Sequence, residues 1–253
     1  MTVCAAQNTK NLMLNLSVSS QRCLPGRTSS IEEPRPCQCA TCGAPGGQQG
    51  QLLEGHIIGK NKRIYLCPYC HVCLHLDIAG RMSAGKIIWL PELSQTELNI
   101  LCLASFVALR KAGVYRKNAP TQVMCEQIIR LYKTFEKRSE AVENFLSGNL
   151  EKSFLTKETL SSPTFLASLI LRAQRDSKLD AKTLANKVDG LRLLITPQAF
   201  DGYVAQVSRL ATADYPVVTW MESVEVHLRT IDAAMQSRDE LEGTFDADLA
   251  NEF

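Results

Sequence analysis

Two short stretches, Cys39-Ala40-Thr41-Cys42-Gly43 and Cys67-Pro68-Tyr69-Cys70, each hold a pair of cysteines separated by two residues. This spacing lets both sulfurs of a pair face one metal ion, and Gly43 frees the backbone to turn directly after the first pair. Twenty-four residues separate Cys42 from Cys67, which is enough for a hairpin that brings the pairs together. Four thiolates leave an ion no open position, so the pattern predicts a structural zinc site with the ligands Cys39, Cys42, Cys67 and Cys70; iron in the same geometry is the alternative.

The same region contains additional residues that can bind metal. Cys37 and Cys73 flank the pairs, and three histidines lie nearby: His56, His71 and His75. Cys37 could replace Cys39 as a ligand, and these residues could form a second metal site. We favour spare thiols for Cys37 and Cys73, because neither belongs to a C-x-x-C pair of its own. For His56 and His71 we favour a structural role, such as a hydrogen bond to the zinc thiolates.

Bulk composition is that of an ordinary globular protein. The 253 residues carry a formal net charge of +2, with 45% hydrophobic and 21% charged residues, so the whole chain has no general attraction for nucleic acid. The N-terminus does not resemble a signal peptide, and the longest nearly apolar stretch, 100–109, is far shorter than the roughly 20 residues of a membrane span. We therefore expect a soluble cytoplasmic protein whose cysteines bind metal in a reducing compartment.

The chain divides by composition into four parts. Residues 1–36 are polar and proline-containing and should form a flexible extension, while 37–93 hold the cysteines and many glycines. Residues 94–238 show helical periodicity, and 239–253 carry acidic but no basic residues, which is typical of a disordered tail. The predicted fold class is α+β and mostly helical, with a small zinc-stapled unit followed by a helical region.

Local signals place several elements. Lys62–Leu66 should be a strand that leads into Cys67, and 86–90 a second extended piece. Ser94 and Glu97 have the spacing of a capping box that begins a long helix. Further helices are expected after Pro120, Pro163 and Pro197, and over 180–190 and from 215 or 219 to about 235.

The order of these motifs resembles the zinc-bound HNH nuclease motif, a ββα-metal unit. In that family a metal-binding residue and a general base end the first strand, an asparagine comes before the second cysteine pair, and a histidine follows it. Here His56 matches the base and His71 the late histidine, but Gly55 stands where a metal ligand is expected and Lys62 stands near the asparagine position. The resemblance implies a retained fold without the chemistry; a divergent metal-dependent nuclease with His56 and His71 as catalytic residues is the alternative.

A longer resemblance covers about residues 37–225. The stretch Ile87-Ile88-Trp89-Leu90-Pro91-Glu92-Leu93-Ser94-Gln95-Thr96-Glu97-Leu98-Asn99, together with the cysteine pairs, 190–194 and Thr219-Trp220, resembles the IcmJ (DotN) family of type IVB secretion systems and I-type conjugative plasmids. The resemblance implies a non-enzymatic zinc protein of the coupling complex, cytoplasmic and peripheral to the bacterial inner membrane.

In that family the partner is the C-terminal extension of the coupling ATPase. An apolar groove could bind this segment, and candidates for its lining are Trp89, Leu90, Leu93, Phe106 and Trp220. A third hypothesis is DNA binding through the basic run 60–63, although such runs are more often solvated turns.

Overall fold

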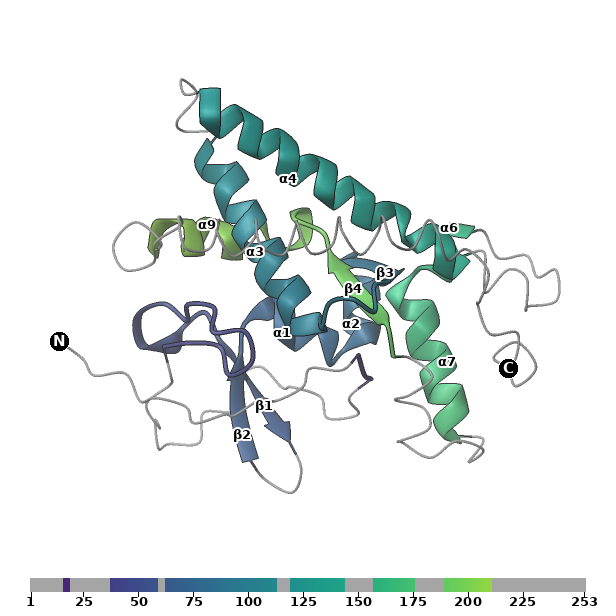
Figure 1. Ribbon diagram of the computed structural model, residues 1–253. Helices are drawn as coiled ribbons and strands as arrows, with labels where there is room; N and C mark the ends of the chain where they lie inside the picture. Colours follow the sequence, from purple (N-terminus) through teal and green to yellow (C-terminus); the bar gives the residue numbers. More distant parts are fainter. Residues whose placement is uncertain are drawn as a thin grey trace.

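Figure 1 shows the computed structural model, which describes residues 16–18, 37–58, 62–112, 119–143, 157–175 and 189–210. The helices (α), 3-10 helices (η) and strands (β) follow in the order η1 (Gln48–Gly50), β1 (Glu54–Ile58), β2 (Lys62–Leu66), α1 (Pro68–Cys73), α2 (Leu76–Arg81), β3 (Gly85–Trp89), α3 (Gln95–Ala112), α4 (Ala119–Lys137), α6 (Lys157–Leu160), α7 (Pro163–Arg175), β4 (Leu191–Ile195), η2 (Gln198–Phe200) and α9 (Asp201–Leu210). This confirms the predicted α+β, mostly helical fold class.

The strands β1 and β2 and the helix α1 form a ββα unit. β1 and β2 form an antiparallel hairpin in which His56 lies opposite Ile64. β2 has the bounds that the sequence predicts, and it leads into Cys67, the N-cap of α1. Pro68 occupies the first turn of α1, where a missing N–H is tolerated. The second cysteine pair therefore lies directly after the hairpin, at the N-terminus of α1.

A second two-stranded sheet joins parts of the chain that are far apart in sequence. β3 pairs antiparallel with β4, with Gly85 opposite Ile195 and Trp89 opposite Leu191. β4 falls within 94–238, where we expected helices. Leu193, Leu194 and Ile195 are buried, and periodicity cannot distinguish so short an apolar run from a helical segment.

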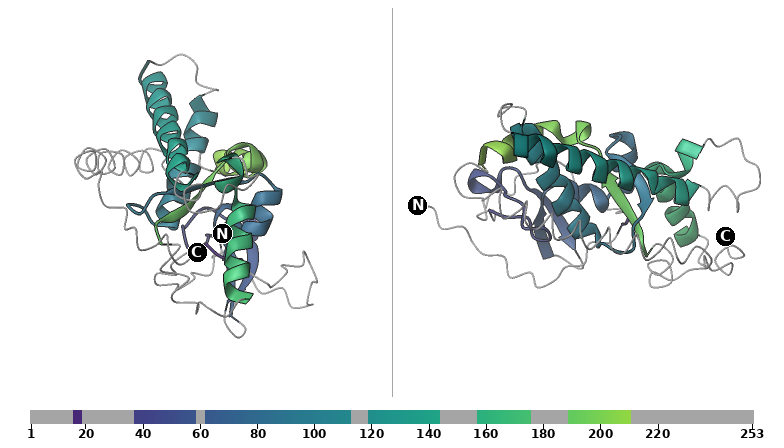
Figure 2. Two further views of the ribbon diagram at one scale, coloured as in Figure 1. Left: turned by 90° about the vertical axis from the view of Figure 1, so that its right-hand side faces the viewer. Right: turned by 45° about the horizontal axis from the view of Figure 1, so that its top comes forward.

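The long helix α3 runs through the centre of the molecule and touches α1, α4, α9 and β4 (Figures 1 and 2). Its start confirms the predicted capping box. The Glu97 amide donates to Ser94 Oγ at 3.2 Å, and the Ser94 amide donates to Glu97 Oε2 at 2.7 Å. Leu98 and Val107 are fully buried, so α3 contributes much of the core.

The remaining described helices begin close to the predicted prolines. α4 begins at Ala119, α7 at Pro163, and η2 with α9 directly after Pro197. The helices expected over 180–190 and 215–235 lie outside the described residues, apart from 189–190, as does the acidic tail. Within the described ranges, no helix is both long enough and apolar enough to cross a bilayer.

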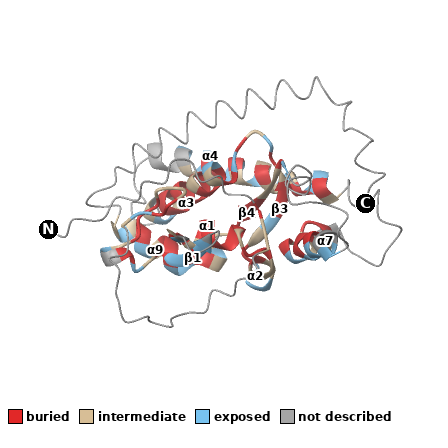
Figure 3. Cartoon of the chain, turned by 90° about the horizontal axis from the view of Figure 1, so that it is seen from below, coloured by how far each residue is buried: buried red, intermediate tan, exposed pale blue. Residues whose placement is uncertain are grey.

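Buried residues form a continuous core from the cysteine pairs to the helices (Figure 3). The ring of Tyr69 on α1 makes edge contacts with Phe106 on α3 and with Phe200 and Tyr203, at centroid distances of 6.5, 5.0 and 5.6 Å. These rings attach the ββα unit to α3 and α9.

Three of the residues suggested for a partner groove lie in the interior. Leu90, Leu93 and Phe106 are buried, so they are core residues and do not form an accessible surface. Trp89 is partly buried and packs against the core, and Trp220 lies outside the described residues. The groove prediction is therefore wrong for the three buried residues.

Candidate metal centre

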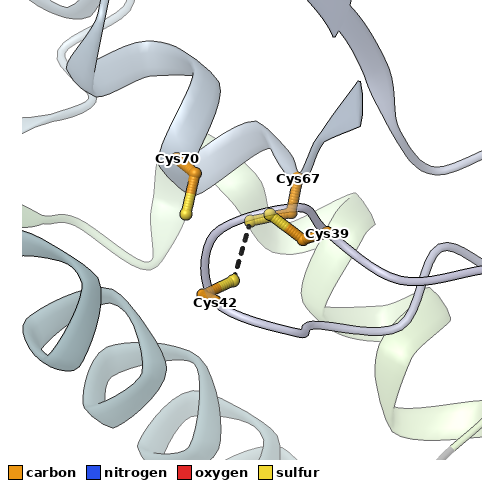
Figure 4. A group of neighbouring side chains, drawn as sticks. All are labelled: Cys39, Cys42, Cys67 and Cys70. Atoms are coloured by element: carbon orange, nitrogen blue, oxygen red, sulfur yellow. Dashed lines mark hydrogen bonds between the residues drawn. The ribbon is translucent and has the colours of Figure 1, made fainter. Parts of the chain in front are cut away.

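The four cysteines of the two pairs converge at the contact between a loop and a helix (Figure 4). Cys39 and Cys42 belong to the tight turn before β1, in which the Gly43 amide donates to the Cys39 carbonyl at 3.1 Å. Gly43 has a φ of 69°, in the left-handed region that glycine adopts without strain. Cys67 and Cys70 come from the N-cap and first turn of α1.

The sulfur geometry suits a tetrahedral ion. The four Sγ atoms lie within 4.8 Å of one another, and those of Cys42 and Cys67 are 3.5 Å apart. Zinc–sulfur bonds of about 2.3 Å place tetrahedral thiolates about 3.8 Å apart, so only a small adjustment would seat the ion. Cys39, Cys67 and Cys70 are buried, which suits a closed structural site.

The electrostatics of the cluster favour a cation. Burial, together with hydrogen bonds to the neighbouring cysteines, holds the pKa of Cys67 well above its usual value. The hydrogen bond to Cys39 contributes most to a raised pKa for Cys42. Thiolates packed together without a counter-charge are unfavourable, and a divalent ion would supply that charge and release the protons.

The two flanking cysteines take other roles. Cys37 stands outside the group of four and is disulfide-bonded, so the expectation of a spare thiol is wrong for this residue. Cys39 is the cysteine that faces Cys42, Cys67 and Cys70. Cys73 is fully buried, and its thiol donates to the carbonyl of Tyr69 at 3.1 Å. The alternative in which Cys37 replaces Cys39 is therefore not what the structure shows.

A buried amide pair supports the cluster from α3. Asn99 Nδ2 lies 3.5 Å from Cys70 Sγ and 3.6 Å from Cys73 Sγ. Its Oδ1 accepts from Gln95 Nε2 at 2.9 Å, and Gln95 also bonds the Leu193 amide and carbonyl in β4. Sequence reasoning missed both residues; their only signal was two amides four apart on the core-facing side of a helix.

The three histidines also converge. His56 comes from β1, His71 from α1, and His75 from the junction of α1 and α2; all three are buried, and their ligand atoms lie within 4.8 Å of one another. His75 Nε2 is 3.3 Å from His56 Nδ1, and His71 Nδ1 is 2.7 Å from Glu54 Oε2. Burial lowers the pKa of His56 and lowers that of His75 to about 4, so these two imidazoles are neutral at neutral pH.

Position 55, where the nuclease pattern has a metal ligand, is occupied by a glycine that faces away from the histidines. Gly55 is in β1, and a Cβ there would contact Arg63 and Tyr65 on the neighbouring strand. Because side chains alternate along a strand, Glu54 and His56 share one face and position 55 points to the other. The carboxylate beside His71 is therefore that of Glu54, a residue that the motif comparison overlooked.

Comparison with known proteins shows similarity to a component of a secretion apparatus. No family model matches the chain. A stretch of 131 residues is 28% identical to "Type 4 apparatus protein DotN" of Legionella pneumophila subsp. pneumophila, covering 51% of this chain and 50% of that protein. The chain thus spans about half the length of the curated relative that it matches. Over this stretch the protein is a distant homologue of DotN.

Proposed function

We infer that this protein is a zinc-stabilised, non-enzymatic component of a type IV transfer apparatus. The observation that carries this proposal is the similarity to the type 4 apparatus protein DotN. The cluster of Cys39, Cys42, Cys67 and Cys70 supports it, because four sulfurs in this geometry suit structural zinc and leave no position for substrate. The zinc ion would hold the 39–42 turn against α1 and so maintain the packing of α1 on α3.

The proposed partner is the C-terminal segment of the coupling ATPase in a type IVB secretion or conjugation system. The protein would act as an adaptor at the cytoplasmic face of the bacterial inner membrane and reach the membrane only through this partner. The resemblance of the 87–99 stretch to the IcmJ (DotN) family supports this partner. Within that stretch, the buried residues Gln95 and Asn99 connect the cysteine cluster to β4.

The test is a pull-down of the tagged full chain from cells that carry the whole transfer system. The wild type should recover the coupling ATPase, and a Cys67→Ala/Cys70→Ala variant should not. A Cys125→Ala variant is the matched control, because Cys125 is a partly exposed free cysteine on α4, outside the cluster. Failure of the wild type and the control to recover the ATPase would refute the proposed partner.

A divergent nuclease is the second candidate, and the buried His56 and His71 beside Glu54 are the observation in its favour. Such an enzyme would use His56 as base and His71 as metal ligand. Magnesium- or manganese-dependent nicking of plasmid DNA that is lost in His56→Ala would promote this candidate over the adaptor. We favour the adaptor because glycine at position 55 supplies no ligand atom.

A further inference from the structure

We propose that the hydroxyl of Tyr203 donates a hydrogen bond to the sulfur of Cys67 when the cysteine cluster holds zinc, and so couples α9 to the metal centre. The inference rests on the zinc site of the proposed function, but it needs neither the transfer apparatus nor the ATPase. Tyr203 would be a positioning residue, which acts on the ion through one of its ligands.

The hydroxyl of Tyr203 is buried and needs an acceptor. The residue is only 8% exposed, and within the described part of the chain its hydroxyl oxygen has no hydrogen-bond partner. A buried hydroxyl without a partner is unfavourable, and phenylalanine would fill the same space without this cost. A tyrosine at this position therefore indicates an acceptor that becomes available in the metal-loaded protein.

The surroundings of Tyr203 identify sulfur as that acceptor. Its ring packs edge-on against Tyr69, which lies in the turn of α1 between two of the ligands, at a centroid distance of 5.6 Å. Burial raises the pKa of Tyr203 well above its usual value, and the charges of Cys67, Cys42 and Cys39 raise it further. Cys67 has the largest effect of the three and also interacts directly with the hydroxyl. The hydroxyl thus faces the cluster and keeps its proton, so it can act as a donor.

Two of the four sulfurs already face a donor from another side chain. Asn99 Nδ2 lies 3.5 Å from Cys70 Sγ, and Thr41 Oγ1 lies 3.3 Å from Cys39 Sγ. Four thiolates around one divalent ion carry a net negative charge, which buried hydrogen-bond donors stabilise. The remaining two sulfurs need the same compensation.

The contact of Cys67 changes when an ion binds. Without metal, the Sγ atoms of Cys42 and Cys67 lie 3.5 Å apart, in a hydrogen bond that requires a proton on one of them. Zinc binds thiolates, so loading the site removes this proton and the hydrogen bond with it. Cys67 then becomes a stronger acceptor next to the unpartnered hydroxyl of Tyr203. Formation of this bond would attach α9 to the ligand at the N-cap of α1 only in the zinc-loaded protein.

The experiment compares Tyr203→Phe with the wild type in the full chain, loaded with cobalt(II) as a spectroscopic substitute for zinc. A sulfur that loses a hydrogen bond gives up electrons more easily, so the thiolate-to-cobalt charge-transfer bands should move to lower energy. Zinc affinity, measured by competition with a chelating dye, should fall about 10- to 100-fold. The substitution keeps the aromatic ring, so the packing against Tyr69 is retained.

Tyr132→Phe is the matched control. Its hydroxyl donates to the Ile195 carbonyl at 2.9 Å, so this variant also loses one tyrosine hydroxyl from the core, and it should keep both the band positions and the zinc affinity. Unchanged bands and affinity in Tyr203→Phe would overturn the inference and leave the zinc site standing. Equal changes in both variants would overturn it as well, because they would reflect general loosening of the core. Absence of thiolate bands in the wild type would refute the zinc site itself.

Discussion

At the scale of single residues, Asn99 connects the cysteine cluster to the helical part of the fold. Its amide nitrogen faces Cys70 and Cys73, and its oxygen accepts from Gln95. Hydrogen bonds to a thiolate spread its charge, and such partners typically change metal affinity by about 10- to 100-fold. Asn99→Leu also leaves one of the two N–H donors of the Gln95 amide without an acceptor, while the other still donates to the Leu193 carbonyl; a buried donor without a partner costs about 1–3 kcal/mol.

We therefore predict that Asn99→Leu weakens zinc binding about 10-fold or more and lowers the free energy of unfolding by about 1–3 kcal/mol. Competition with a chelating dye measures the first effect, and urea unfolding measures the second. Gln127→Leu, which replaces an exposed amide on α4, serves as control and should change neither value appreciably. Equal zinc affinity in the Asn99 variant and the wild type would contradict this role.

His75 makes the stability of the fold depend on pH. Burial lowers its pKa from 6.5 to about 4, and repulsion by His71 and His56 adds to this effect, while Asp77 and Glu54 oppose it. Between these values the unfolded chain holds a proton that the folded chain lacks. Stability is therefore fully present above pH 6.5 and is lost as pH falls toward 4.

We predict that the free energy of unfolding falls by about 2 kcal/mol between about pH 7 and about pH 5, because His75 takes up a proton in the unfolded chain before it does so in the folded chain. Urea unfolding at the two pH values measures the change, and His75→Gln should have a smaller one. The carboxylate of Glu54, whose pKa is lowered mainly by its hydrogen bond with His71, loses its stabilising effect only below its ordinary value of 4.5. A change of the same size in His75→Gln would assign the pH dependence to other groups.

At the scale of elements, the β3–β4 sheet requires a glycine at its end. Gly190 has a φ of 85°, and a Cβ there would lie 2.6 Å from ring atoms of Trp89. The Gly190 carbonyl also accepts from the Leu90 amide at 2.8 Å, so the backbone cannot move away easily. The indole of Trp89 thus packs directly on the backbone that begins β4.

We predict that Gly190→Ala lowers the free energy of unfolding by about 2–4 kcal/mol, through the left-handed backbone and the clash with the indole. Gly202→Ala is the matched control because a Cβ there meets nothing within 4 Å; in α9 it should leave stability unchanged or raise it by up to about 1 kcal/mol. Chemical denaturation of both variants tests this. Equal stabilities would show that the indole does not pack on Gly190.

At the scale of the whole molecule, the cysteine cluster and the helices share one core. Tyr69, in the first turn of α1 between Cys67 and Cys70, packs against rings of α3 and α9, while β3 pairs with β4. Loss of the 39–42 turn would expose this shared core. We therefore expect zinc removal to affect helices far from the site, even though composition divides the chain at about residue 93.

We predict that a strong chelator abolishes the cooperative thermal transition of the full chain. Structural zinc contributes on the order of 10 kcal/mol to folding, as much as the whole stability of a typical domain at about 5–15 kcal/mol. Differential scanning calorimetry should show one transition with zinc and none, or one at a far lower temperature, after chelation. A helical transition that survives chelation unchanged would mean that 94–238 folds independently of zinc.

The sequence by itself determined the features that depend on neighbouring residues. The pairs Cys39/Cys42 and Cys67/Cys70 carry their spacing in the chain, the capping box needs only Ser94 and Glu97, and the strand at 62–66 follows from local propensity and alternation. The resemblance to the DotN family likewise depended on short motifs, and the comparison supports it. Each of these signals lies within a few residues, where backbone geometry fixes the outcome.

Only the tertiary structure decided the contacts between distant residues. The pairing of β3 with β4 spans about a hundred residues, and nothing local in Leu191–Ile195 distinguishes a strand from a buried helical segment. The Asn99 contact with Cys70 and the meeting of His56, His71 and His75 arise in the same way. Such contacts form because burying apolar surface folds separate elements onto one core, which brings together polar groups whose proximity no sequence spacing encodes.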